Sequence, residues 1–475
     1  MTTPRAIAAV FFTSAAILVL EIIASRLMAP YVGISLETYT GIIGTVLAGI
    51  ALGAAVGGRL ADRYDSRGLI GPVLVIGGAL TWLSMPIVAV LGPQVSAGPV
   101  AIVILTSAAF LLPAAVLSAI SPMIAKIRLD RIDDTGTVVG GLSAAGTIGG
   151  LAGTFITGFV LLAALPSRPV LIVVGGLLIV AGFVAVVAFR RKAPVVPAVV
   201  LVVVAGLLVA GSSGPCQYET GYFCVRIEND AANPAGRSLY LDRLRHAYVD
   251  LEDPTHLDIR YIRLFRDVAE TAPDGALDVL HIGGGGFTFP RYIDATRPGS
   301  DNRVLEIDAD LVRLNEEQLG LRLTENLTVR TGDGRLALQD EPTDSRDLVI
   351  GDAFGSTSVP WHLTTAEVIA EIERVLRPRG LYVMNVLDGG DSGFAKAELA
   401  TLADRFEHVA VILPADGVPS NRPVNQVLIA SDEPIPELGI DPADGRLLVG
   451  EEALAYRGDA MILTDDFAPV DRLLI

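Results

Sequence analysis

Seven long apolar runs in the first 212 residues constrain the fold of this 475-residue chain more than any other feature. A helix needs about 20 apolar residues to cross a lipid bilayer. The expected transmembrane helices cover residues 6–28, 38–58, 70–92, 99–123, 137–163, 169–189 and 194–212. Buried helices of a soluble protein are the alternative, but seven such runs in series are not typical of soluble cores. A cleaved signal peptide is disfavoured for the first run, which contains Glu21 and no clean small-residue cleavage site.

The charge of the chain changes where the apolar runs end. Residues 1–212 contain 12 Lys and Arg and 7 Asp and Glu, whereas residues 213–475 contain 24 and 46. One alternate set of short loops carries nearly all the basic residues of the first part: Arg5, Arg59, Arg63, Arg67, Lys126, Arg128, Arg131, Arg190, Arg191 and Lys192. The other set carries only Arg168. The positive-inside rule therefore predicts a multi-pass protein of the cell membrane with a cytoplasmic N-terminus and, after seven spans, residues 213–475 on the outer face.

Two ionisable residues and two cysteines in this part are candidates for special roles. Glu21 and Arg26 fall within the first apolar run, where charged side chains are costly and often functional. A structural pair between these two residues is the alternative. Cys216 and Cys224 follow the last run and are either a disulfide, which persists in an oxidising compartment, or two free thiols. Their spacing, without clustered histidines, predicts no metal site.

The pattern becomes that of an α/β protein after the apolar runs. Residues 213–272 contain short alternating runs that predict a small antiparallel β subdomain with a linking helix. Residues 273–475 then alternate strands and helices, which is typical of a doubly wound parallel sheet. The expected strands are 277–282, 303–307, 326–330, 346–351, 380–386, 408–413 and 425–430, and the last two favour an antiparallel edge.

Glycines and acids follow four of these strands, at the edge where ligands of doubly wound sheets bind. The glycines of the loop are Gly283, Gly284, Gly285 and Gly286. The acids are Glu306, Asp308, Asp333 and Asp352, and Gly334, directly after Asp333, is a further candidate for ligand binding. A glycine loop brings backbone N–H groups close to a ligand, and an acid about 20 residues later is placed to bind ribose hydroxyls. The pattern predicts an adenosine-type ligand. The chain lacks a GxxxxGK[ST] element and a third helix-packing glycine, which argues against a nucleoside triphosphate and a dinucleotide.

These motifs, "HIGGGG", "VLEID", "TGDGR" and "LVIGDAF", resemble those of spermidine synthases. The segments "LYLDRLRHAYVDLEDPTHLDIRYIRLF" (239–265) and "ILTDDFAPVDRL" (462–473) resemble the membrane-fused branch of that family. The resemblance implies a multi-span helical membrane domain, a small β subdomain and a Rossmann-like domain of the class I methyltransferase type. It further implies that Glu306 holds the ribose, that Asp333 binds the adenine amino group and that Asp352 accepts a proton from the attacking amine.

The chain departs from the family pattern at the positions that recognise the amine. Gly286 stands where the family has an acid facing the aminopropyl ammonium, and Gly355 stands where it has a second catalytic-loop acid. His246 stands in place of a glutamine of the N-terminal lid. Four acids are candidate replacements for substrate binding, or else solvated surface acids: Asp253, Asp258, Asp465 and Asp466.

Three functions fit this sequence. The first is a membrane-anchored transferase that moves an aminopropyl group from decarboxylated S-adenosylmethionine to a small polyamine-type amine. The second is a methyltransferase that uses S-adenosylmethionine, which the missing acid at Gly286 favours modestly. The third is a non-catalytic module that binds a polyamine or nucleoside and is coupled to the membrane domain. Nucleic acid is not an expected partner, because the acidic second part repels phosphates.

Overall fold

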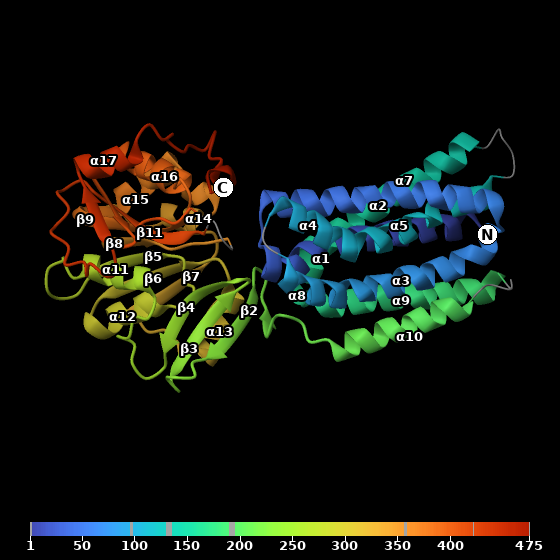
Figure 1. The fold of residues 1–475 in the computed structure, drawn as a ribbon, viewed down its shortest axis with the longest axis horizontal. Helices are drawn as coiled ribbons and strands as arrows, with labels where there is room; N and C mark the ends of the chain where they lie inside the picture. The colour runs from blue at the N-terminus through green and yellow to red at the C-terminus, as the bar shows by residue number, and fades with distance from the viewer. Residues whose placement is uncertain are drawn as a thin grey trace. The chain divides into compact units, whose positions relative to one another are not determined.

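The computed structural model describes residues 2–95, 98–129, 135–189, 195–355, 359–420 and 422–474. The chain divides into two compact units, Met1–Val225 and Arg226–Ile475, which we call unit 1 and unit 2 (Figure 1). The expected boundary lay earlier, after residue 212. The division falls later because residues 219–221 bond to the helices of unit 1.

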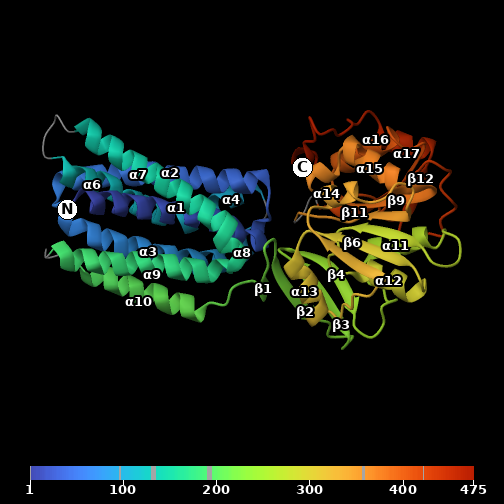
Figure 2. The same cartoon turned by 180° about the vertical axis from the view of Figure 1, so that it is seen from behind.

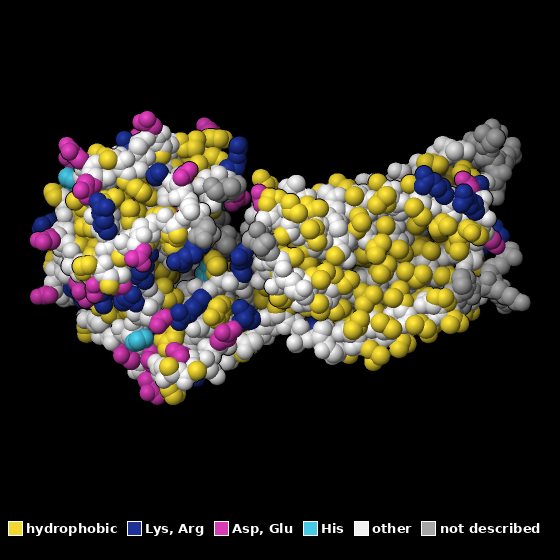
Figure 3. All heavy atoms as spheres, in the orientation of Figure 1, with side chains coloured by type: hydrophobic (Ala, Val, Ile, Leu, Met, Phe, Trp, Pro, Cys, Tyr) yellow, Lys and Arg dark blue, Asp and Glu magenta, His cyan; other side chains and the backbone are white. Residues whose placement is uncertain are grey.

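Unit 1 is a helical bundle. Its single helices are α1 (Thr3–Val32), α2 (Leu36–Arg63), α3 (Ser66–Leu91), α9 (Ser167–Phe189) and α10 (Val195–Gly211). One longer stretch consists of α4 (Pro99–Thr106), η2 (Ser107–Leu111), α5 (Leu112–Ser118) and α6 (Ile120–Arg128). Another consists of α7 (Thr135–Ile156), η4 (Thr157–Leu161) and α8 (Leu162–Ala164). Six helical stretches among the described residues are long and apolar enough to cross a membrane, and α10 is a shorter apolar helix. Hydrophobic side chains cover the visible face of this unit, and Lys and Arg side chains gather at one end of it (Figure 3).

The chain enters and leaves this bundle at opposite ends. Lys126 pairs with Asp62 at 2.8 Å and Arg128 donates to the hydroxyl of Thr3, so the start of α1 lies beside the ends of α2 and α6. At the other end, the backbone N–H of Ser167 donates to Glu219 at 3.0 Å. The helix α10 packs along α3 between these two ends (Figures 1 and 2). With 17 residues α10 is shorter than the six long apolar stretches, so a seventh membrane span stays a prediction. Residues 130–134 and 190–194, with Arg131, Arg190, Arg191 and Lys192, lie outside the described part.

Small residues allow α1 and α7 to pack closely. A Cβ atom on Gly149 or Gly153 of α7 would lie 2.2 or 2.5 Å from the carbonyl oxygen of Phe11 or Ala15 of α1. Only glycine fits at such distances, as is common between membrane helices. The helix pair thus depends on these two positions.

A small antiparallel sheet precedes the α/β part of the chain. Its strands are β1 (Tyr218–Glu219), β2 (Cys224–Asn229), β3 (Gly236–Leu241) and β4 (Leu244–Asp250), in the order β1-β2-β3-β4. The division between the two units falls within β2. The fold of this segment agrees with the alternating pattern of its sequence.

Unit 2 is built on an eight-stranded sheet in the order β12-β10-β11-β9-β8-β5-β6-β7. The strands are β5 (Asp278–Ile282), β6 (Asp301–Glu306), β7 (Leu327–Thr331), β8 (Arg346–Gly351), β9 (Leu376–Asp388), β10 (His408–Leu413), β11 (Val424–Ser431) and β12 (Arg446–Val449). Strands β5 to β9 are parallel, and β9, β11, β10 and β12 pair antiparallel. The seven expected strands are all present, and β12 is an additional strand that forms the edge.

Helices cover both faces of this sheet. They are α11 (Arg260–Ala269), α12 (Thr288–Thr296), α13 (Ala309–Gln318), α14 (Gly334–Gln339), α15 (Ala366–Val375), α16 (Gly393–Ala403), α17 (Glu451–Arg457) and α18 (Val470–Leu473), with the short η5 at Trp361–Leu363. One apolar core joins the sheet to α14, α15 and α16, and another joins it to α11 and α12. The strand order reverses between β5 and β8, so a ligand of such a fold is expected at the carboxyl ends of these two strands.

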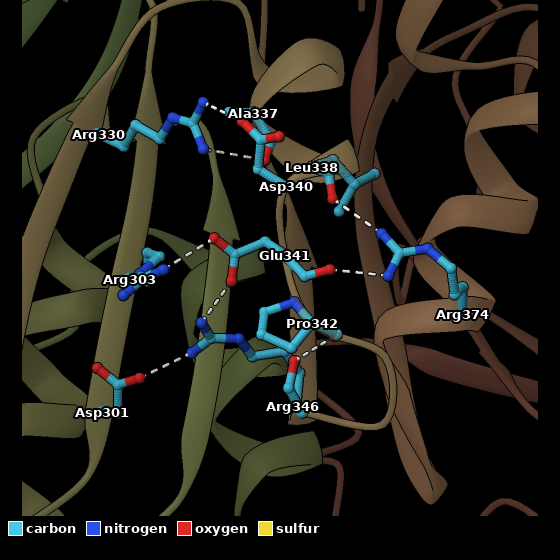
Figure 4. A network of polar contacts seen from close by, with 11 residues as sticks. Asp301, Arg303, Arg330, Ala337, Leu338, Asp340, Glu341, Pro342, Arg346 and Arg374 are labelled. Carbon is cyan, nitrogen blue, oxygen red and sulfur yellow. Dashed lines mark hydrogen bonds and ion pairs between the residues drawn. The ribbon is translucent and has the colours of Figure 1, made fainter.

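An ion-pair network lies at the other edge of the sheet, at the amino ends of the parallel strands (Figure 4). Glu341 accepts from Arg346 of β8 at 2.5 Å and from Arg303 of β6 at 3.1 Å, and Arg346 also binds Asp301 at 2.9 Å. Arg374 of α15 donates to the backbone carbonyl of Glu341 at 2.7 Å. The side chains of Glu341 and Arg346 are only 1% and 4% exposed, so this pair is part of the core.

Candidate active site

The glycine loop follows β5 and packs against the carboxyl end of β8. Gly283 has a φ of 100°, and a Cβ atom there would lie 2.4 Å from the carbonyl oxygen of Asp352. The N–H of Asp352 donates to the carbonyl of Ile282 at 2.9 Å. Glycine is required at 283 both for its conformation and for this close approach. The loop thereby places Asp352 directly beside the expected ligand cradle.

Glu306, at the end of β6, holds the glycine loop from the other side. Its Oε2 accepts from the N–H of Gly284 at 2.8 Å and of Gly285 at 3.3 Å, and its Oε1 accepts from the N–H of Asp308 at 2.9 Å. Burial raises the pKa of Glu306, and these backbone donors act against that rise. A carboxylate has about four acceptor positions. Three are used here, so the carboxylate keeps the capacity to accept one hydrogen bond from a ligand.

Asp308 and Asp333 both cap helices. Asp308 is buried and accepts from the N–H groups of Asp310 and Leu311 at 3.0 and 3.2 Å at the start of α13. Asp333 accepts from the N–H of Leu336 at 3.1 Å, and its other oxygen lies 3.2 Å from Nε2 of His362. Gly334 is the first residue of α14. Asp333 is partly exposed at the strand end, whereas Asp308 is committed to its helix.

Asp352 lies at the end of β8 between two neutral donors. The hydroxyl of Tyr261 donates to Oδ2 at 3.0 Å, and Nδ2 of Asn385 donates to Oδ1 at 2.9 Å. Among the residues that the structure describes, no arginine or lysine forms an ion pair with this carboxyl group. Burial raises the pKa of Asp352 to about 7, although both hydrogen bonds lower it. Such a group exchanges a proton near neutral pH, as a general base must.

The residues that hold Asp352 were not predicted from the sequence. Tyr261 belongs to α11 and Asn385 to β9, 91 and 33 residues away from Asp352. Asn425 of β11 donates to Oδ1 of Asn385 at 3.0 Å and fixes the orientation of its amide. The available signal was the presence of asparagines in otherwise apolar strands, since buried polar groups need partners.

The structure also accounts for the missing acid at Gly286. A Cβ atom there would lie 2.4 Å from Cβ of Ala247 on β4. The next residue, Phe287, has a φ of 56° and is fully buried at the start of α12. The loop therefore packs against β4 at the position where the resembling family carries a carboxylate, and it has no room for one.

The predicted substrate residues lie in different surroundings. The ring of His246 lies 6.3 Å from that of Phe354, in the loop that follows Asp352. Asp253 accepts from the backbone and hydroxyl of Thr255 within a turn. Three more acids complete the set: Asp258 pairs with Arg245 at 2.8 Å, Asp465 binds Arg335 at 2.7 and 2.6 Å, and Asp466 is exposed. Of these residues, only His246 contacts the segment that carries Asp352.

The candidates in unit 1 lie near the end of α1. Cys216 and Cys224 form a disulfide, with Cα atoms 5.1 Å apart. Arg26 lies 3.5 Å from Glu219 and donates to the carbonyl oxygens of Gly221, at 2.7 Å, and of Thr220. In the described part of the chain Arg26 does not pair with Glu21, so the alternative of a structural pair between them is wrong.

Comparisons with known proteins identify relatives of the chain. No family model matches it. A polyamine aminopropyltransferase of Vibrio vulnificus is 25% identical over 209 residues, which cover 41% of this chain and 69% of that protein. A polyamine aminopropyltransferase of Chromobacterium violaceum is 26% identical over 187 residues, covering 38% and 68%. The crystal structure of a probable spermidine synthase from Corynebacterium glutamicum is similar with 27% identity and a TM-score of 0.50, covering 53% of this chain and 97% of that one.

The glycine loop, the strand-end acids and these similarities agree with one another. The similarity to the solved structure extends over nearly the whole length of that protein. By sequence and by fold, the chain is spermidine synthase-like: it is similar to the two polyamine aminopropyltransferases and to the probable spermidine synthase.

Proposed function

We propose that unit 2 transfers an aminopropyl group from decarboxylated S-adenosylmethionine to a small amine. The relatives named polyamine aminopropyltransferase support this reaction. Bound at the carboxyl ends of β5 and β8, the sulfonium donor supplies an activated carbon, from which a neutral thioether leaves when the amine nitrogen forms its new C–N bond. The amine must then lose a proton. Asp352 is the proposed acceptor of that proton.

The observation that carries this proposal is the environment of Asp352. A carboxylate with an ordinary pKa is a weak base, but burial raises the pKa of Asp352 to about 7. Tyr261 and Asn385 fix its two oxygens. The pKa of Tyr261 is itself raised well above its usual value by burial, so its phenol stays protonated and keeps donating. One oxygen of Asp352 can then accept the proton without a change of orientation.

The residues around the glycine loop fit an adenosyl group. A Cβ atom on Gly285 would meet nothing within 4 Å, so the loop borders open space there. In our proposal the backbone of Gly283, Gly284 and Gly285 lies against the donor, and Glu306 accepts one ribose hydroxyl through its remaining acceptor position. To accept a second ribose hydroxyl, Glu306 must release the N–H of Gly285. That hydrogen bond is the longest of the three that Glu306 accepts, at 3.3 Å. Asp333, at the start of α14, is the proposed partner of the adenine amino group.

The packing of Gly286 favours a second candidate, a methyltransferase that uses S-adenosylmethionine. Ala247 fills the position from which an acid would recognise the ammonium group of an aminopropyl chain. A methyl donor needs no such acid. The two reactions share the adenosyl site and the base and differ in the donor accepted.

Product analysis distinguishes these reactions. The purified full-length protein is incubated with 1,4-diaminobutane and related amines and with either donor, and products are identified by mass spectrometry. We expect a mass gain of one aminopropyl group with the decarboxylated donor. Asp352→Asn should reduce turnover by about 10²- to 10⁴-fold, the usual contribution of a general base. Methylated products only would establish the second candidate, and neither product would contradict both.

A matched control lies on the same strand. Asp347 is near the amino end of β8 and pairs with Arg377 at 2.6 Å, away from the glycine loop. Asp347 also accepts from the N–H of Asp278 at 2.9 Å, and an asparagine keeps an oxygen for that hydrogen bond. Asp347→Asn should retain turnover within about threefold, since a partly exposed ion pair contributes little to stability. Equal losses in Asp347→Asn and Asp352→Asn would show that the loss reflects folding rather than proton transfer.

We also propose that unit 1 anchors the enzyme in the cell membrane, with the N-terminus in the cytoplasm and unit 2 on the outer face. The six long apolar stretches, with α10 as the proposed seventh span, and the basic residues at the end that carries Thr3 support this orientation. The disulfide between Cys216 and Cys224 agrees with an oxidising compartment. Such a location requires that the donor be supplied on that face.

Reporter fusions after Asp250 test the orientation. An alkaline phosphatase fused there should be active and a green fluorescent protein dark, because the first folds outside the cytoplasm and the second inside. Fusions within the 64–65 turn should give the reverse pattern. A cytoplasmic signal after Asp250 would mean that α10 does not cross the membrane.

A further inference from the structure

Unit 1 contains a pocket of about 570 Å³ that the reaction of unit 2 does not use. Its walls come from α1, α2, the stretch η4 to α8 and the segment at residues 221–222. Most of the lining side chains are aliphatic: Ile22, Ile34, Ile42, Ile43, Leu162 and Ala163. This volume is within the range of about 300 to 1,000 Å³ that is common for small-molecule sites.

Glu21 is the acid that lines this pocket. It lies in the second half of α1, and its side chain is only partly accessible. Among the described residues, no donor or cation contacts its carboxylate. Arg26, which also lines the pocket, is committed to Glu219 and to the carbonyl oxygens of Thr220 and Gly221. The pocket therefore combines an aliphatic wall with one carboxylate that lacks a protein partner.

The chemistry of the lining determines the class of ligand. An isolated carboxylate within an apolar helix is costly, and a positively charged partner relieves that cost. A bare divalent cation requires several oxygen ligands, and the described residues contain no cluster of three or more His, Cys, Asp or Glu. An organic cation needs only one carboxylate to balance its charge, and its carbon chain is buried against aliphatic side chains.

We propose that this pocket binds a small organic amine, with the ammonium group on Glu21 and the aliphatic chain against Ile42, Ile43 and Leu162. The pocket lies toward the end of the bundle where the chain leaves it, since Gly221 and Tyr222 contribute to its wall. The inference does not depend on the reaction proposed for unit 2. It gives the helical bundle a binding function beyond anchoring.

Equilibrium dialysis of the full-length protein in detergent, with radiolabelled 1,4-diaminobutane as the probe, tests this site. Any binding by unit 2 is common to all variants, so differences between them report on the pocket. Glu21→Gln should weaken one class of site by about 10- to 100-fold, the usual effect of losing a hydrogen bond to a charged group. Unlabelled 1-aminobutane should compete at this site, whereas butan-1-ol should not.

Two further variants keep the test decisive. Glu37→Gln changes an exposed acid in the first turn of α2 and should bind like the wild type. Gly158 lines the pocket, and a Cβ atom there would meet nothing within 4 Å, so a side chain can be introduced at this position. Gly158→Leu should occupy part of the pocket and weaken the same binding. If Glu21→Gln does not fold, the amine binding of Gly158→Leu decides whether the pocket is the site. Unchanged binding in the folded variants, or equal competition by butan-1-ol, would overturn the proposal, whatever products unit 2 forms.

Discussion

The two ends of the eight-stranded sheet both carry acidic side chains, but they hold them differently. At the amino end, Glu341 is enclosed by the guanidinium groups of Arg303 and Arg346 (Figure 4). At the carboxyl end, Asp352 and Glu306 are held by hydroxyl, amide and backbone N–H donors. Among the described residues neither of these two acids has an ion pair.

This difference separates a structural charge from the acid that we propose as the reactive one. A cation beside a buried carboxylate stabilises the ionised form, so the acid stays charged and contributes to the fold. Neutral donors offset only part of the pKa rise that burial causes, and the pKa of Asp352 therefore rises to about 7. The same sheet thus pairs its buried acid with arginines at the amino end and has neutral donors around the proposed base at the carboxyl end.

Removing the acid at the amino end should give the largest effect on stability. Glu341→Gln removes the buried carboxylate partner of Arg346, which is 4% exposed, and leaves only the more exposed Asp301 to pair with it. We expect a loss of about 3 to 5 kcal/mol in the free energy of unfolding, as is usual for a broken buried pair. Urea unfolding of the full-length protein, followed by hydrogen exchange of peptides from β6 and β8, measures it.

The neighbouring acid is the control for this change. Asp340 binds Arg330 on the surface, with side chains 64% and 46% exposed. Asp340→Asn should cost no more than about 1 kcal/mol. The distinction between the two ends of the sheet would fail if Glu341→Gln were as mild as Asp340→Asn, or if Asp352→Asn destabilised unit 2 as much as Glu341→Gln.

A smaller effect is expected when an acid is introduced at the carboxyl end. Gly286→Asp places a Cβ atom 2.4 Å from Cβ of Ala247, so β4 and the loop must separate. We expect a loss of about 1 to 3 kcal/mol, typical of overpacking, with a lower melting temperature of unit 2. The double variant Gly286→Asp/Ala247→Gly should recover most of this loss. If the single variant is as stable as the wild type, packing does not explain the glycine.

The sequence predicted the elements whose signal is local. Strands β5 to β11 follow apolar runs bounded by turn residues, and the glycines and acids at their ends follow from the same register. It did not predict β12, because the four residues Arg446–Val449 are too short to show a period.

Long-range contacts explain the rest. The donors to Asp352 come from α11 and β9, and only the folded sheet brings them together. The sequence offers Asp258 and Asp465 as candidates only through their charge, and the structure shows each beside an arginine, Arg245 or Arg335. Whether an acid has a cation beside it is a property of the fold, and this property distinguishes Asp352 from Asp258 and Asp465.

The pH dependence of the transfer step tests the role of Asp352 most directly. The group accepts a proton only when it is ionised, so the single-turnover rate at saturating substrate should rise about tenfold per pH unit below its pKa and level off above about pH 7. Tyr261→Phe removes a hydrogen bond that lowers this pKa and should move the break to higher pH. A rate that shows no break between pH 6 and 8, or a break that Tyr261→Phe leaves in place, would contradict the assignment of Asp352 as the base.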